Sequence, residues 1–371
     1  MVASIKKEVF LVKKLCVRLG SKSYNIHFND SFDGLVCALK EINAPEKMLI
    51  VTDTNVEKLY ANEVNSILKS AGYDTAVFSF SAGEENKGMD TVLSICNALM
   101  EYQMDRKSMI LALGGGVVGD MAGFAAAIYM RGISFVQVPT TLLSQSDSSV
   151  GGKTGVDFSN AKNILGAFHQ PKMVYINVST LKTLPQKEFI SGMGEVIKHS
   201  VIRDSEFFEY LHNNADKVKK SECDILLQMA YKNCSIKAEV VSRDEFENGL
   251  RADLNFGHTF GHAIESYFNF TLTHGECVAL GMVAASYIAK SRGEFPEEDF
   301  YKLENILKLY GFKIRINLDN KKAIKELMLK DKKKSGNELR FILPEKTGAV
   351  IQTYDVTTAQ IDDALDYLSD C

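Results

Sequence analysis

Two patterns of apolar and polar residues alternate in the first half of the chain. Residues 15–19 and 24–28 flank a Gly-Ser-Lys-Ser turn, which predicts a β-hairpin. Four later apolar runs are typical of buried strands: residues 48–52, 75–80, 108–113 and 133–138. Helical patterns separate these runs, and one opens at the polar cap Asp53-Thr54-Asn55 and continues to Leu68. Strands that alternate with helices predict a parallel sheet with helices on both faces.

The pattern changes near residue 180. From Gln186 onward, apolar residues recur at helical spacing, and the next predicted strand covers residues 339–343. A chain of 371 residues exceeds what one hydrophobic core usually serves. We therefore expect an α/β fold, with an N-terminal Rossmann-like parallel-sheet domain, residues 1–178, and a mostly α-helical C-terminal domain, residues 179–371.

Composition excludes several classes of protein. The net charge is −4, so no basic field indicates nucleic-acid binding, and an anionic ligand would need a local cluster of cations. No apolar run approaches the ~20 residues of a membrane span, and lysines interrupt the apolar runs near the N-terminus, so we expect no membrane segment and no signal peptide. The seven cysteines form no CxxC pair, which favours reduced thiols and a cytoplasmic protein.

A glycine-rich segment follows the third of the buried runs. The motif Gly114-x-Gly116-x-x-Gly119 lies between a predicted strand and a predicted helix, which is the context of a dinucleotide-binding loop. Its backbone N–H groups would approach a pyrophosphate at the helix N-terminus. No acidic residue lies at the usual distance downstream to hold a ribose, but Asp53 or Glu84 could serve instead. The alternative is a tight turn that needs glycine for packing alone.

Three histidines suggest a metal site in the second half of the chain. His258 and His262 are spaced i, i+4 on one face of a predicted helix, and His274 lies on or near the next helix. Imidazoles at such spacing suit a divalent cation, and Glu195, at an apparent helix start, is the best source of another ligand. The alternative for Glu195 is an acid that only stabilises a helix N-terminus.

Cations accompany these motifs: Arg131, Lys153, Lys162, Lys237 and Arg251. In a net-acidic chain, cations beside glycines and histidines suggest an anionic substrate, although each taken singly is more often a surface charge.

Together the motifs resemble those of the 3-dehydroquinate synthases, within the sugar-phosphate cyclase group, over nearly the whole chain. The segments that carry the resemblance are residues 114–120, Pro139-Thr-Thr-Leu-Leu, Asp147-Ser-Ser-Val-Gly-Gly-Lys153, Lys162-Asn163, Gly194-Glu-Val-Ile-Lys198, Glu247-x-Gly-Leu-Arg251, Asn255-Phe-Gly-His-Thr-Phe-Gly-His262 and His274-Gly-Glu. The resemblance implies a homodimeric enzyme of the shikimate pathway that depends on NAD and on zinc or cobalt. It would convert 3-deoxy-D-arabino-heptulosonate 7-phosphate into 3-dehydroquinate and phosphate by transient oxidation, phosphate elimination and intramolecular aldol closure.

The resemblance also implies roles for individual residues. The implied metal ligands are Glu195, His258 and His274. The residues implied to hold the substrate phosphate are Lys153, Asn163, Lys198, Asn255 and His262, with Arg131 from a second subunit. Lys237 and Arg251 are implied on the carboxylate side, and one of Lys332, Lys333 and Lys334 would close the pocket. Glu247 and His262 are the implied proton carriers. The implied NAD site comprises Asp53, Asn55, Glu84, Lys87, Gly115, Gly116, Val117, Asp120, Thr140, Thr141, Asp147, Lys162, Thr180 and Thr183.

Three other functions compete with this interpretation. A related cyclase would make an inosose or a valiolone, and it would have an altered substrate pocket. A metal-dependent polyol or alcohol dehydrogenase would share the architecture but would have no need for cations that converge on an anion. A catalytically dead homologue would bind NAD or a partner, but every acid, base and ligand of the motifs is present.

Overall fold

The structure is a computed structural model that describes residues 14–159, 161–247, 249–335 and 339–369, with the side chains of all of these except residues 330–335. Its largest sheet has seven strands in the order β1-β2-β9-β6-β5-β3-β4. The strands are β1 (Lys14–Val17), β2 (Tyr24–Asn29), β3 (Lys47–Asp53), β4 (Asp74–Phe80), β5 (Met109–Gly114), β6 (Ser134–Pro139) and β9 (Met173–Asn177). All neighbours pair in parallel except β1 and β2, which form the predicted hairpin.

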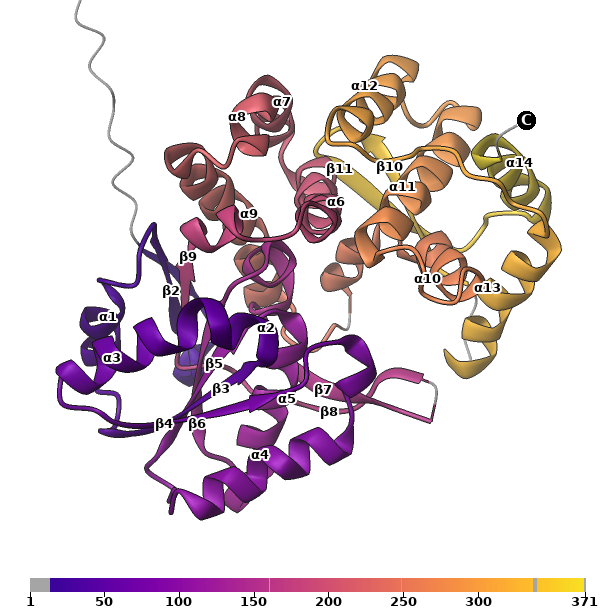
Figure 1. The fold of residues 1–371 in the computed structure, drawn as a ribbon. Coiled ribbons are helices and arrows are strands. Elements are labelled where there is room, and N and C mark those ends of the chain that lie inside the picture. The colour runs from indigo at the N-terminus through magenta and orange to yellow at the C-terminus, as the bar shows by residue number, and fades with distance from the viewer. Residues whose placement is uncertain (1–13, 160, 248, 336–338, 370–371) are drawn as a thin grey trace, which may run out of the picture.

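Helices cover both faces of this sheet, as the sequence predicts (Figure 1). They are α1 (Leu35–Glu41), the short α2 (Thr54–Val56), α3 (Asn62–Ser70), α4 (Met89–Glu101) and α5 (Gly116–Ile128). Side chains alternate across β3: Met48 and Ile50 pack with α1 and α3, whereas Leu49 and Val51 pack with α4 and α5. Burial on both faces explains why these strands are continuous apolar runs.

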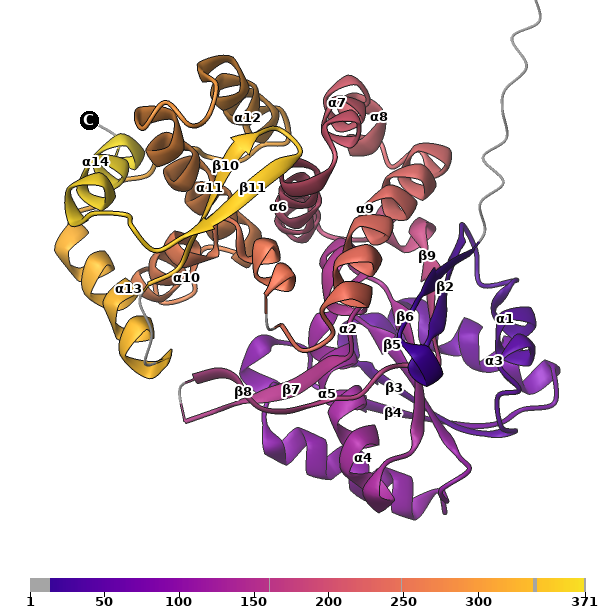
Figure 2. The same ribbon diagram turned by 180° about the vertical axis from the view of Figure 1, so that it is seen from behind.

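Beyond β9 the described chain is mostly helical. The helices are α6 (Gln186–Arg203), α7 (Ser205–Asn213), α8 (Ala215–Lys219), α9 (Cys223–Arg243), α10 (His258–Tyr267), α11 (His274–Ser291), α12 (Glu297–Leu309), α13 (Lys321–Ser335) and α14 (Thr358–Leu368). A small hairpin, β10 (Phe341–Lys346) and β11 (Ala349–Thr353), lies across α11 (Figure 2). Among the described residues, no helix is both long and apolar enough to cross a membrane.

The sequence patterns did not predict every strand. They missed β9, β11 and the two-stranded hairpin of β7 (Lys153–Phe158) and β8 (Ala161–Phe168). All five residues of β9 are buried, so this short run lacks the alternation that marks a half-buried strand. One hydrophobic cluster joins Ile26 and Ile176 of the sheet to Val240 of α9, so the two halves share a core, and a domain boundary at residue 178 stays a prediction.

Candidate active site

Glycine contacts bring two helices of the second half unusually close together. A Cβ added at Gly275 of α11 would lie 1.9 Å from the Ser191 carbonyl oxygen of α6, and one added at Gly194 would lie 2.8 Å from the Gly275 carbonyl oxygen. The backbones can approach this closely only because neither residue has a side chain. As a result Glu195, on α6, lies beside His274, the first residue of α11.

Donor atoms of Glu195, His258 and His274 all lie within 4.8 Å of one another. Glu195 Oε1 is 3.7 Å from His258 Nε2 and 3.5 Å from His274 Nε2, and it is buried without a hydrogen-bond partner in the described structure. The other oxygen, Oε2, accepts a hydrogen bond from Lys198. A buried carboxylate oxygen without a partner is costly. A divalent cation between these three donors would satisfy it, so the residues fit a metal.

The outer nitrogens of both histidines face other acceptors. His258 Nδ1 lies 3.2 Å from the Phe256 carbonyl oxygen, and His274 Nδ1 lies 3.7 Å from Glu265 Oε2. Each Nε2 is therefore left to face Glu195. The third histidine, His262, is exposed, with its ring centroid 5.1 Å from that of His258. His262, Glu265 and His274 form a second candidate metal group, which shares His274 with the first group.

Electrostatics keeps the site in a state suited to a cation. Burial raises the pKa of Glu195, but the Lys198 ammonium group, His274 and His258 together outweigh burial and hold this pKa well below its usual value. Burial and Lys198 together lower the pKa of His258 far below its usual value. Burial also lowers the pKa of His274, yet Glu195 and Glu265 raise it to about 9. Glu195 is thus ionised and His258 neutral near pH 7, as metal ligands must be, whereas His274 would release its second proton when a metal binds.

One detail of the prediction for Glu195 is wrong. The sequence placed it at a helix start, but α6 begins at Gln186, and Glu195 lies in its middle. Glycines at positions 192 and 194 imitate a helix boundary, whereas here they serve close packing. The alternative that Glu195 only stabilises a helix N-terminus is therefore excluded.

The carboxyl ends of β3, β5 and β6 form an edge suited to a nucleotide. Strand β3 pairs with β4 on one side and β5 on the other, so the chain order switches between β3 and β5, where ligands of parallel sheets bind. Asp53 ends β3 and caps α2 by accepting from the N–H groups of Asn55 and Val56. Helix α5 begins at Gly116. Its N-cap residue, Gly115, has no side chain that could accept from the N–H groups of the first turn, so these groups suit an anion.

The packing alternative for the glycine motif holds for part of it. A Cβ at Gly114 would lie 2.5 Å from Val118, and one at Gly119 would lie 2.5 Å from Gln137 Oε1. Gly114 is therefore needed for contact between the end of β5 and α5, whereas a side chain at Gly119 would displace the end of the Gln137 side chain. Gly115 and Gly116 meet neighbours only at 3.0 and 3.1 Å, so packing demands them less.

Other predicted cofactor residues gather along the same edge. Buried Lys87 donates to Asp120 Oδ2 and to Asn163 Oδ1, both at 2.7 Å, and so ties the segment after β4 to α5 and β8. Thr140 follows β6 and donates its N–H to the Gly114 carbonyl oxygen. The remaining residues of this set lie in the segments that follow the strands: Asn55 in α2, Glu84 after β4, Val117 in the first turn of α5, Thr141 after β6, and Thr180 and Thr183 after β9.

Lys153, Lys237 and Arg251, three of the predicted substrate cations, are each held by an acceptor. Lys153 pairs with Glu247, which also accepts from Asn255 Nδ2 at 3.0 Å. Lys237 donates to Asp147 Oδ1 at 2.5 Å. Arg251 is buried, and its guanidinium group donates to the carbonyl oxygens of Glu245 and Gly151.

The structure does not bring Arg131 to the glycine end of α5, and the predicted lysine contact lies among side chains that are not described. Arg131 is exposed beyond the end of α5, a helix about 20 Å long at 1.5 Å per residue, whose other end carries the glycine motif. The side chains of Lys332, Lys333 and Lys334 lie outside the described residues.

Two family models match consecutive parts of the chain. The 3-dehydroquinate synthase N-terminal model matches residues 77–191, and the 3-dehydroquinate synthase C-terminal model matches residues 192–334. The chain belongs to the 3-dehydroquinate synthase family. A 3-dehydroquinate synthase from Acetivibrio thermocellus is 49% identical over 340 residues, which cover 91% of this chain and 94% of that one. One from Ruminiclostridium cellulolyticum is 47% identical over 337 residues, with the same coverage.

Solved structures of two other cyclases and of a dehydrogenase share the fold of this chain. The structure is similar to 2-epi-5-epi-valiolone synthase from Streptomyces hygroscopicus with NAD⁺ and Zn²⁺, at 26% identity and TM-score 0.85 over 93% of this chain and 96% of that one. It is also similar to 2-deoxy-scyllo-inosose synthase complexed with carbaglucose-6-phosphate, NAD⁺ and Co²⁺, at 25% identity and TM-score 0.84, over 95% and 99% of the two chains. A Thermotoga maritima butanol dehydrogenase, at 14% identity and TM-score 0.65 over 93% and 96%, shares the fold alone.

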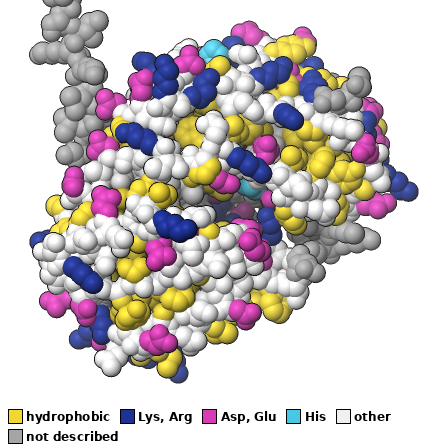
Figure 3. Space-filling view, viewed as in Figure 1, with side chains coloured by type: hydrophobic (Ala, Val, Ile, Leu, Met, Phe, Trp, Pro, Cys, Tyr) yellow, Lys and Arg dark blue, Asp and Glu magenta, His cyan; other side chains and the backbone are white. Residues whose placement is uncertain are grey.

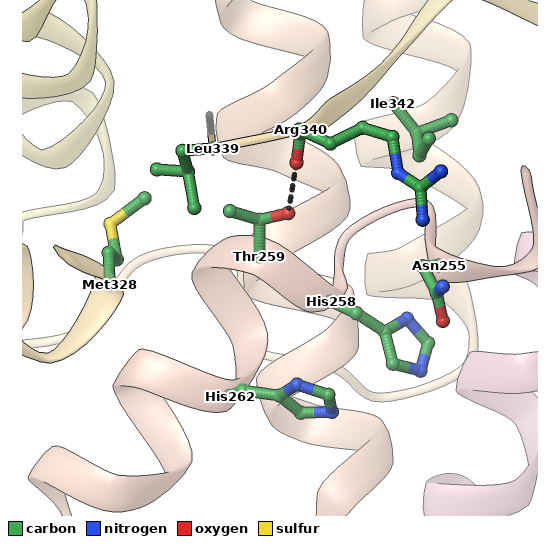
Figure 4. A pocket seen from close by; sticks show the side chains of 8 residues that line it. All are labelled: Asn255, His258, Thr259, His262, Met328, Leu339, Arg340 and Ile342. Carbon is green, nitrogen blue, oxygen red and sulfur yellow. Dashed lines mark hydrogen bonds between the residues drawn. The ribbon is translucent and has the colours of Figure 1, made fainter. Parts of the chain in front are cut away.

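The structure adds residues that the motifs of the 3-dehydroquinate synthase family did not single out. A cavity of about 230 Å³ lies beside the histidines, lined by Asn255, His258, Thr259, His262, Met328, Leu339, Arg340 and Ile342 (Figure 4). Arg340 accepts from the Thr259 hydroxyl through its carbonyl oxygen, and no acid pairs with its guanidinium group among the described residues. The space-filling view shows a hollow between the two halves, with histidine and charged side chains in it (Figure 3). A lone arginine before an apolar strand gives no sequence signal.

Proposed function

We propose that this protein converts 3-deoxy-D-arabino-heptulosonate 7-phosphate into 3-dehydroquinate and phosphate, with NAD and zinc or cobalt bound. The observation that carries this proposal is the unpartnered Glu195 Oε1 between two imidazole Nε2 atoms. A carboxylate with two imidazoles suits zinc or cobalt, and the nearby cations suit a substrate with a phosphate and a carboxylate. The identity of 49% and 47% to chains named 3-dehydroquinate synthase supports this substrate over those of the valiolone and inosose cyclases.

Glu195, His258 and His274 would hold the metal, which when bound supplies a Lewis acid for a substrate hydroxyl. The edge between β3 and β5 would hold NAD⁺, which supplies a hydride acceptor, within residues 1–178. The chain itself would orient the metal ion and NAD⁺, because the sheet and the helices that pack through glycine contacts are rigid.

The polar residues around the metal group would bind and orient the substrate. Lys153, Lys198 and Asn255 would meet its phosphate, and they would exchange their present carboxylate partners for it. Lys237 and Arg251, held from the other side by Asp147 and by backbone carbonyl oxygens, would face its carboxylate. Exposed His262 and the carboxylate of Glu247 would carry protons to and from the reacting carbons.

We further propose a cytoplasmic homodimer. In such a dimer Arg131, exposed beyond the end of α5, would contact the phosphate bound to the second copy. One of Lys332, Lys333 and Lys334 would complete the pocket from α13, whose Met328 lines it.

Phosphate release tests the proposed reaction. Purified protein loaded with metal and NAD⁺ should release phosphate from the heptulosonate phosphate, while absorbance at the NADH band shows no net accumulation, because the cofactor is regenerated in each turnover. Stoichiometric NADH from a neutral polyol would instead indicate a dehydrogenase. Tight binding of metal and NAD⁺ without phosphate release would indicate a catalytically inactive relative.

Replacing Arg340 with Met should raise the KM for the sugar phosphate. A hydrogen bond to a charged group contributes roughly 1.5–3 kcal/mol, so we expect a rise in KM of roughly 10- to 100-fold with metal content unchanged. Steady-state phosphate release measures the effect. Arg243→Met is the matched control, because Arg243 is exposed and pairs with Glu239 of the same helix, α9. Equal KM values for the two variants would remove Arg340 from the substrate pocket.

A further inference from the structure

Glu265 is a buried acid in the second half of α10 that the proposed mechanism does not use. It lies seven residues after His258 and three after His262, so all three project from one face of the helix. Its side chain is 7% exposed, and both of its oxygens have partners. Burying an ionised carboxylate is costly unless such partners offset it, so this placement needs a reason.

The first partner is the proposed metal ligand His274. Glu265 Oε2 lies 3.7 Å from His274 Nδ1, while His274 Nε2 lies on the other side of the ring, 3.5 Å from Glu195 Oε1. The ring therefore stands between two carboxylates. A carboxylate at Nδ1 favours the tautomer with a proton on that nitrogen, which leaves the Nε2 lone pair directed at Glu195 and His258.

The second partner comes from the other half of the molecule. Lys162 of β8 lies 3.0 Å from Glu265 Oε1, and its ammonium group also lies 4.4 Å from the centroid of the Phe270 ring. The lysine restricts the rotation of the carboxylate by binding the oxygen that does not face His274. Since Lys162 belongs to the proposed NAD site, this contact connects the nucleotide edge to the metal group.

We propose that Glu265 is a positioning residue that holds His274 in its metal-binding orientation and tautomer, with Lys162 fixing the carboxylate. This inference rests on the proposed function, because it needs Glu195, His258 and His274 to be the ligands. In the competing arrangement Glu265 itself would be a ligand together with His262 and His274. Both of its oxygens are already engaged, one by a lysine and one by a histidine ring, which favours the positioning role.

Metal affinity of Glu265→Gln tests the proposal without relying on turnover. The substitution keeps the shape and removes the charge, and loss of such a supporting group typically weakens metal binding by roughly 10- to 100-fold. Zinc affinity would be measured by competition with a chromophoric chelator, and the ligand set by the absorption spectrum of the cobalt-loaded protein. Glu304→Gln is the matched control, because Glu304 is equally buried and paired with Arg315, away from the histidines.

The proposal expects weaker zinc binding by Glu265→Gln than by Glu304→Gln, with the cobalt bands of a three-ligand site retained. Equal zinc affinities for the two variants would overturn it. So would a cobalt spectrum in Glu265→Gln that shows a lost ligand while Glu195→Gln keeps the bands of the unchanged protein, since Glu265 would then be a ligand. Unchanged zinc affinity in Glu195→Gln is a separate outcome that contradicts the proposed metal site itself.

Discussion

Replacing His274 with Ala should abolish both bound metal and phosphate release. His274 supplies one of three donors that converge within 4.8 Å, and two protein ligands do not hold a catalytic zinc at the concentrations in which proteins are purified. A Lewis acid contributes several kcal/mol to stabilising the transition state, so turnover should fall by at least roughly a thousandfold. Metal content by elemental analysis and initial rates of phosphate release are the two measurements.

A second histidine replacement provides the control for this result. His212 Nε2 on the surface of α7 accepts from Asn305 Nδ2 at 3.2 Å, away from the metal group, so His212→Ala should keep metal and activity. Retained metal and turnover in His274→Ala would show that the Glu195, His258 and His274 assignment is wrong. Retained metal in His274→Ala but not in His262→Ala would point to a ligand set built on His262.

The sequence predicts the main sheet well because burial on both faces leaves a strong local signal. The runs that became β3, β5 and β6 are mostly apolar and buried, whereas the edge strand β4 is only partly buried; each run ends at a turn or cap. Strand β9 has only five residues and pairs with β2, nearly 150 residues earlier in the chain, so nothing nearby in sequence reveals it. The β7–β8 hairpin depends on Gly155 and Gly166 facing each other across the strands, a contact that no periodicity shows.

The sequence likewise predicts the part of the candidate site that lies on one helix, but not the contacts between distant segments. Spacing along one helix predicts that His258 and His262 share a face, and α10 confirms it. Spacing alone also suggests that these two bind one metal together, whereas the structure turns His258 Nε2 towards Glu195, which is 63 residues earlier in the chain. Residues such as Arg340 and Lys162 meet the site through tertiary packing, so only coordinates reveal which group each one faces.

Replacing Gly275 with Ala should disturb stability and metal binding together. The added Cβ would lie 1.9 Å from the Ser191 carbonyl oxygen and 2.6 Å from its carbonyl carbon, which are backbone atoms within α6 and cannot turn aside. Helix α11 must therefore move away from α6, and His274 at its first residue must move away from Glu195. Overpacking of this kind typically costs roughly 1–3 kcal/mol of unfolding free energy.

Thermal unfolding with and without zinc separates the two effects of Gly275→Ala. The metal-free variant should unfold at a lower temperature than the unchanged protein, and zinc should raise its unfolding temperature less, because ligand stabilisation falls as the dissociation constant rises. Gly88→Ala is the matched control, since a Cβ there meets no atom within 4 Å. If Gly275→Ala matched this control in both measurements, the close approach of α6 and α11 would not be what brings Glu195 and His274 together. A variant that lost stability but kept its full response to zinc would separate the packing of the helices from the geometry of the metal ligands.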